Sequence, residues 1–223
     1  MKKIFVFSSF IATGVILLGG SQISFAEETV SGSANGQGAT SYGSIELTPD
    51  SDSGTDPLVP TTPSGKTGNV GELTIDNVSP FVFGTQRLTG KKAIYYSTTT
   101  DGNVQVTDKR GTGVGWTLQV RSSDFIDSQN KSNILKGAQV TIPVGTVSSD
   151  TDNSSTAPTS SEVALNATDA TIFKAAAQSG LGSWVDKFDG ADNESKVSIE
   201  IPSGSMKGSY VSTITWTLAD APK

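Results

Sequence analysis

The sequence predicts an all-β fold, either a β-sandwich or a barrel-like domain, with one short helix and long loops rich in Ser, Thr, Gly and Pro. Three observations predict it. β-Branched and aromatic residues recur in short alternating runs, turn-forming residues return about every ten positions, and the chain contains 24 glycines. A length of 223 residues is sufficient for one domain with a sizeable hydrophobic core.

The first residues have the organisation of a secretory signal peptide. Lys2 and Lys3 form a basic start, residues 4–18 are an uncharged apolar run, and Ser24-Phe25-Ala26 offers small residues at a cleavage site. We therefore expect residues 1–26 to be a signal peptide and the mature protein to be secreted. A retained N-terminal anchor is the alternative, although the apolar run is short for a membrane span.

The mature chain divides into a leader and one domain. Residues 27–43 are rich in Gly, Ser and Ala and predict a flexible leader. The domain is expected over residues 44–223, with a possible first strand at 44–48. Residues 49–68 contain four prolines and several acidic residues, and this composition predicts a loop that buries little surface.

Alternating apolar residues predict the strands of the domain. Asp101-Gly102-Asn103 has the composition of a hairpin turn between two of them, and Pro143 indicates an edge strand or a bulge. The expected strands cover residues 71–78, 93–98, 104–107, 116–120, 139–144, 197–201 and 210–218.

One segment, residues 170–179, has the pattern of a helix. Asp169 can serve as its N-cap, and Ile172 and Ala176 begin an apolar stripe with i, i+4 spacing. Gly180 stands where a glycine commonly ends a helix. The following segment, residues 182–188, is expected to be a packed loop.

The composition excludes several kinds of chemistry. The chain contains no cysteine and no histidine, so it has neither a Ser-His-Asp triad, a thiolate nucleophile, a disulfide nor an ordinary zinc or copper site. An incomplete acidic run near residue 50 lacks the spacing of a calcium loop. Carboxylate chemistry is the remaining enzymatic option, and a wall-active hydrolase that uses paired carboxylates is the alternative that stays open. The acidic residues lie mostly in loops and turns, where turn formation is their usual role, so we expect no cofactor, no metal ion and no enzymatic activity.

The net charge limits the partners. The formal charge of −6, without a basic stripe, argues against nucleic acid and against binding to anionic membranes. The mature part contains no second apolar run of membrane length, so we do not expect a membrane protein. Net charge would likewise oppose attachment to any other anionic surface, such as a bacterial wall. Attachment of that kind could not depend on net charge, so it should persist in about 0.5 M salt.

Two tripeptides share the pattern Trp-x-Leu. Trp116 and Leu118, and likewise Trp216 and Leu218, project from one face of a predicted strand. If the two strands are neighbours, the four side chains form one apolar patch. Two interpretations remain open: the patch fills the core, as tryptophan on an amphipathic strand usually does, or it binds a ligand or partner.

The charged residues before the first motif also have two interpretations. Asp108, Lys109 and Arg110 could fix a loop by ion pairing, or they could contact a partner.

These motifs and their flanks resemble the WxL-domain cell-surface proteins of low-GC Gram-positive bacteria. The similar segments are GELTIDN at residues 71–77, VQVTDKRGTGVGWTL at 104–118 and YVSTITWTLADAP at 210–222. The resemblance implies a non-enzymatic protein of the cell surface that attaches non-covalently to peptidoglycan in the cell wall. The absence of a Leu-Pro-x-Thr-Gly signal and of a lipidation cysteine agrees with this attachment.

The same resemblance implies protein partners. WxL proteins are typically encoded with other WxL proteins and with a membrane-anchored WxL-interacting protein. An alternative function is therefore that of a subunit in a surface complex, docked to such a partner by strand addition at an exposed edge. Trp116, Leu118, Trp216, Leu218, Asp108, Lys109 and Arg110 are the candidate binding residues for either function.

Overall fold

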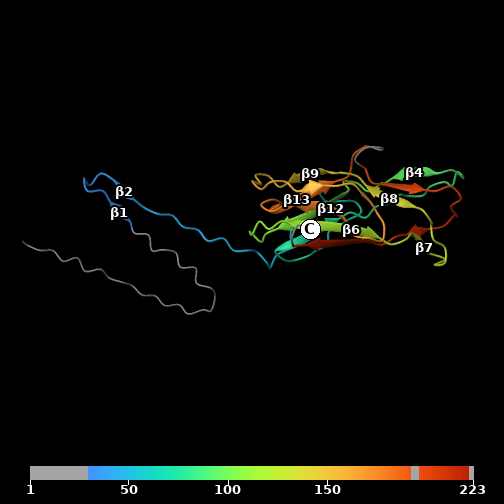
Figure 1. Cartoon of the computed structure of the whole chain (residues 1–223), viewed down its shortest axis with the longest axis horizontal. Coiled ribbons are helices and arrows are strands. Elements are labelled where there is room, and N and C mark those ends of the chain that lie inside the picture. Colours follow the sequence, from blue (N-terminus) through green and yellow to red (C-terminus); the bar gives the residue numbers. More distant parts are fainter. Residues whose placement is uncertain (1–29, 192–195, 221–223) are drawn as a thin grey trace, which may run out of the picture. The chain divides into compact units, whose positions relative to one another are not determined.

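A computed structural model describes residues 30–191 and 196–220 (Figure 1). The expected signal peptide lies outside the described residues. The chain separates into two units, Met1–Glu46 and Leu47–Lys223. The described part of the first unit contains a two-stranded hairpin, β1 (Ser31–Gly32) with β2 (Ala39–Thr40). The strand predicted at residues 44–48 is absent, because this exposed segment pairs with no other strand.

The second unit is built from antiparallel sheets, which confirms the prediction of an all-β fold. The sheets do not close into a barrel. Three sheets have four strands each, and they are named here after one central strand. The β6 sheet has the order β10 (Thr159–Ser160), β12 (Ala170–Ala175), β6 (Trp116–Ser122) and β16 (Ile214–Ala219).

The other sheets complete the domain. The β14 sheet has the order β11 (Val163–Ala164), β8 (Gln139–Ile142), β14 (Ser198–Ile201) and β4 (Ala93–Tyr96). The β5 sheet has the order β3 (Leu73–Val78), β5 (Asn103–Asp108), β13 (Gly182–Lys187) and β9 (Thr146–Ser149). A short pair joins β15 (Tyr210–Val211) to β7 (Ile126–Asp127).

A single hydrophobic cluster connects the three larger sheets. Val106 comes from the β5 sheet, Leu118 from the β6 sheet and Ile199 from the β14 sheet, and all three belong to the same buried cluster. Alternation along each strand explains the arrangement, since every second side chain points to the same face. The sheets are therefore held together by their shared apolar faces.

The helix predicted at residues 170–179 is wrong. Residues 170–175 form β12, which pairs with β6. A bulge between Thr171 and Phe173 shifts the register, and both Ile172 and Phe173 are buried. Two adjacent buried residues break the alternation of a regular strand, and this bulge produced the helix-like apolar pattern. No helix in the described part of the chain could cross a bilayer.

Three further predictions need correction. The turn at residues 101–103 exists, with Asp101 at φ 54°, but it connects β4 to β5, which lie in different sheets. It is therefore not a hairpin turn. Residues 182–187 form β13 instead of a loop. The long strand predicted at residues 210–218 is divided into β15 and β16, which pair with different strands.

The loop at residues 49–68 lies against β5 through amide side chains. Gln105 accepts a hydrogen bond from the Leu58 amide at 2.6 Å and donates one to the Asp56 carbonyl at 3.1 Å. Asn103 donates to the Val59 carbonyl at 2.8 Å. These bonds satisfy the backbone of a segment that has few apolar side chains to bury.

Candidate functional site

The two Trp-x-Leu motifs lie side by side. β6 and β16 are paired antiparallel strands, with Leu118 opposite Leu218 and Val120 opposite Trp216. Residues directly opposite each other in such a pair share one face of the sheet. The side chains of both motifs belong to the hydrophobic cluster or pack against it, so the apolar patch formed by the motifs faces the core.

Trp116 is fully enclosed. Its indole Nε1 donates a hydrogen bond to the Gly180 carbonyl at 3.0 Å, and its ring meets Phe173 edge to face with centroids 5.1 Å apart. Trp116 and Leu118 are 0% exposed. A side chain without accessible surface cannot contact a ligand, so the burial of these two residues favours packing over binding.

Trp216 and Leu218 keep part of their surface. Both are partly buried and pack against the hydrophobic cluster from the edge strand β16. Among the strands in the described residues, β16 pairs only with β6. A binding role for these two residues therefore remains a prediction.

Asp108 and Arg110 form a largely buried ion pair, which we call the Asp108–Arg110 brace. The Arg110 Nη2 lies 2.8 Å from Asp108 Oδ2 and donates to the Gly115 carbonyl at 2.9 Å. Nη1 donates to the Asp220 carbonyl at 3.0 Å. Hydrogen bonding to Asp108 raises the pKa of the guanidinium. Arg110 thus joins the end of β5 to the turn before Trp116 and to the end of β16, which favours a structural role.

Lys109 points to the acidic loop. Its Nζ donates to the Ser53 carbonyl at 2.8 Å and lies 3.4 Å from Asp50 Oδ2. The three charged residues therefore do not converge on one exposed site: Asp108 and Arg110 pair with each other, and Lys109 holds residues 50–53.

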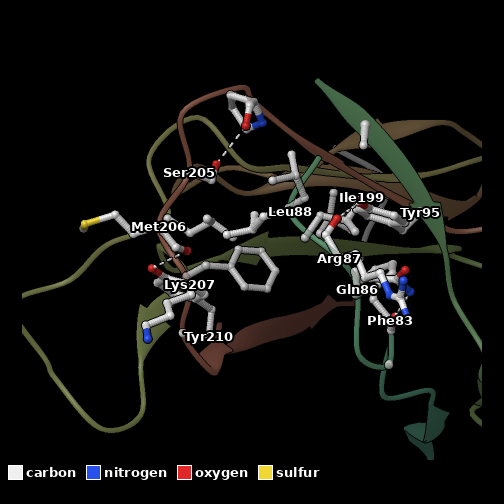
Figure 2. A pocket seen from close by; sticks show the side chains of 18 of the residues that line it. Phe83, Gln86, Arg87, Leu88, Tyr95, Ile199, Ser205, Met206, Lys207 and Tyr210 are labelled. Atoms are coloured by element: carbon white, nitrogen blue, oxygen red, sulfur yellow. Dashed lines mark hydrogen bonds between the residues drawn. The ribbon is translucent and has the colours of Figure 1, made fainter. Parts of the chain in front are cut away.

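A hollow lined mainly by apolar and aromatic residues lies elsewhere, and we call it the aromatic groove. It has a volume of about 620 Å³ and lies between residues 81–95 and residues 199–214. Figure 2 shows Phe83, Gln86, Arg87 and Tyr95 on one side and Ser205, Met206, Lys207 and Tyr210 on the other, with Leu88 between them. Its aromatic lining residues are Phe81, Phe83, Tyr95, Phe125 and Tyr210.

Each wall of the groove is held by bonds within its own segment. On one side, the Tyr95 hydroxyl donates to the Arg87 carbonyl at 3.2 Å, and the Gln86 amide donates to the Phe83 carbonyl at 2.7 Å. On the other, the Tyr210 hydroxyl donates to the Met206 carbonyl at 3.2 Å. These bonds fix the loops that form the two walls of the groove.

Apolar side chains remain exposed at this groove. Leu88 is 54% exposed, Met206 is 56% exposed and Val211 is also exposed. Large apolar groups gathered on a surface are typical of binding sites. The sequence does not reveal this site, because its two walls are more than a hundred residues apart and come together through the pairing of β4 with β14.

No group of three or more acidic side chains in the described residues could hold a metal ion. The described residues that line the groove are mainly apolar and aromatic, with the cations Arg87, Lys91 and Lys207 among them. The profile of the family "WxL domain surface cell wall-binding" matches residues 34–222.

The chain belongs to this family. The protein is therefore located at the cell surface and attaches non-covalently to the cell wall through its WxL domain. The family is one of binding domains and is not a known enzyme family. A comparison with curated proteins finds no match.

Proposed function

We propose that this WxL domain attaches to the wall by direct contact with peptidoglycan, and that the aromatic groove makes this contact. The observation that carries the proposal is the coincidence of five aromatic side chains with exposed Leu88 and Met206 in one hollow. Aromatic rings provide flat apolar surfaces with polar edges, which suit sugar rings and acetyl groups.

In this proposal the Trp-x-Leu motifs act indirectly. Trp116 and Leu118 stabilise the β6 sheet from inside the core, and Asp108 and Arg110 fix the turn that leads into it. Substituting these residues should lower wall binding only as far as it unfolds the domain.

A second candidate function is docking to a partner protein, the membrane-anchored WxL-interacting protein or another WxL protein. The observation that favours it is the open edge of β16, whose pairing within the described strands is with β6 alone. An unpaired edge can accept a strand from another chain. Trp216 and Leu218 would then lie at the interface.

Sedimentation with purified, protein-free sacculi tests the first proposal. The groove variant Leu88→Ser/Met206→Ser changes two exposed side chains, so it should fold normally and bind less. The matched control is Val144→Ser, because Val144 is 51% exposed and does not line the groove. Circular dichroism and melting should show all three proteins folded.

The outcomes separate the two functions. Equal binding by the groove variant and the wild type would contradict the role of the groove. If the wild type does not sediment with bare sacculi but is retained by cells that carry the partner, the domain attaches through protein. We also expect no soluble sugar or peptide fragments to be released from the wall; their appearance would contradict a purely binding function.

A further inference from the structure

The charge of the aromatic groove is opposite to that of the protein. Arg87, Lys91 and Lys207 line it, and none of the described residues that line it is Asp or Glu. The whole chain has a net charge of −6, so an average patch of this surface would be acidic. The groove is therefore a local cationic site in an acidic protein.

These three cations also have no carboxylate partner among the residues that the structure describes. Several basic residues elsewhere in the described part of the chain form ion pairs, among them Lys66 with Asp56, Lys92 with Glu200 and Arg110 with Asp108. No ion pair within the described residues involves Arg87, Lys91 or Lys207. Their charges are available to an anion that enters the groove.

The apolar lining limits what that anion is. A polyol phosphate has charge but little apolar surface, and it would leave Leu88, Met206 and the aromatic rings without a partner. A short peptide with methyl-bearing side chains and free carboxylates matches both properties. Peptidoglycan supplies such a peptide as the alanine-rich stem attached to its glycan strands.

We infer that the aromatic groove binds the acidic peptide stems of peptidoglycan, with Arg87, Lys91 and Lys207 receiving their carboxylates and the aromatic lining receiving their apolar side chains. This inference rests on the proposed function, in which the groove contacts the wall. It reverses the salt dependence expected from net charge, because local attraction between exposed charges is screened within several ångströms at about 0.5 M salt.

The first test compares soluble ligands by calorimetric titration of the mature protein. The ligands are a disaccharide carrying an intact stem, the same fragment with its carboxylates amidated, and glycan strands from which an amidase has removed the stems. We expect the intact fragment to bind most tightly. Amidation should weaken binding about tenfold, as expected when two or three exposed ion pairs are lost.

The second test changes the protein. Lys91→Gln/Lys207→Gln should weaken binding of the intact fragment by about fivefold, and the difference from the wild type should shrink in about 0.5 M salt. The matched control is Lys66→Gln/Lys131→Gln, which has the same net charge and alters exposed lysines outside the groove. The control should bind the fragment as the wild type does.

Failure of this inference differs from failure of the proposed function. Equal affinity of the lysine variant and its control, or full binding to glycan without stems, would overturn peptide recognition while Leu88→Ser/Met206→Ser still lost sacculus binding. If removal of teichoic acid from walls, and not removal of stems, abolished binding, the anion would be phosphate and the inference would be wrong. If the Leu88→Ser/Met206→Ser variant also bound normally, both proposals would fail.

Discussion

Leu118 and Leu218 lie directly opposite each other on β6 and β16, with their side chains in and against the same core. Each belongs to one of the two Trp-x-Leu motifs, which are a hundred residues apart in the sequence. The two motifs are therefore neighbours in the sheet, and their apolar side chains help to hold the edge strand β16 against β6. This pairing gives a structural reason for two copies of the same tripeptide.

The first prediction concerns Trp116. Trp116→Ala removes a fully buried indole, its hydrogen bond to Gly180 and its contact with Phe173. We expect the free energy of unfolding to fall by about 3–5 kcal/mol, measured by urea denaturation. Trp216→Ala should cost less, because Trp216 is only partly buried.

Fluorescence provides the control for this assignment. The chain has three tryptophans, and Trp116 and Trp184 are buried, so acrylamide should quench mainly Trp216. Trp216→Phe should remove most of the quenchable emission while the domain stays folded. Strong quenching of that variant would contradict the enclosure of Trp116.

Regular alternation made half of the sixteen strands in the described residues predictable, and the segment assigned to a helix was missed for a physical reason. Trp116, Leu118 and Val120 follow the two-residue period of a strand, and their strand was placed correctly. Ile172 and Phe173 are adjacent and both buried because of a bulge, so their spacing matched a helix. A bulge depends on the partner strand, and its position is not visible in the local sequence.

The second prediction concerns Gly180. Its φ is +73°, and a Cβ there would lie 2.4 Å from the Ala175 Cβ and 2.8 Å from the Trp116 Nε1. Gly180→Ala therefore combines backbone strain with a clash in the core, and we expect a loss of about 2–4 kcal/mol in stability. Thermal denaturation measures it.

Gly204→Ala is the matched control. Gly204 has a similar φ of +78°, but a Cβ there meets nothing within 4 Å. Only the strain of the left-handed conformation remains, which costs about 1–2 kcal/mol. Equal losses in the two variants would show that contact with Trp116 and Ala175 does not restrict position 180.

The third prediction concerns the Asp108–Arg110 brace. Arg110→Gln leaves the enclosed Asp108 carboxylate without its ion pair, and we expect a loss of about 3–5 kcal/mol in stability by urea denaturation. Asp108→Asn/Arg110→Gln should recover part of this loss, because no buried charge is left alone. A double variant less stable than the single one would contradict this account.

The candidate site was less predictable than the fold. The Trp-x-Leu motifs attract attention because tryptophan is rare, but rarity does not distinguish a core residue from a binding residue. Arg87 and Lys207 stand in unremarkable loop sequences, and their common position follows from the pairing of β4 with β14. Tertiary pairing of this kind cannot be read from one strand at a time.

The fourth prediction concerns Asp186 and pH. Asp186 is 0% exposed; its Oδ2 accepts a hydrogen bond from Ser160 at 2.7 Å, and its Oδ1 has no partner. Burial raises the pKa of this carboxyl from 3.8 to about 7. The pKa of Asp186 is higher in the folded than in the unfolded state. The folded state is therefore most stable while Asp186 is protonated, and this contribution to stability is complete below about pH 4 and is lost as pH rises through 7.

Wild-type stability should therefore fall by about 2–3 kcal/mol between pH 5 and pH 8, measured by urea denaturation. The chain has no histidine and no cysteine, so no other side chain ordinarily changes charge in this range. Asp186→Asn keeps the shape without the charge and should make stability nearly independent of pH there. The control Asp124→Asn, at an exposed position, should keep the wild-type slope of stability against pH. Equal slopes for Asp186→Asn and the wild type would contradict the assignment of this pH dependence to Asp186, because Asp186 would then be charged at no cost inside the fold.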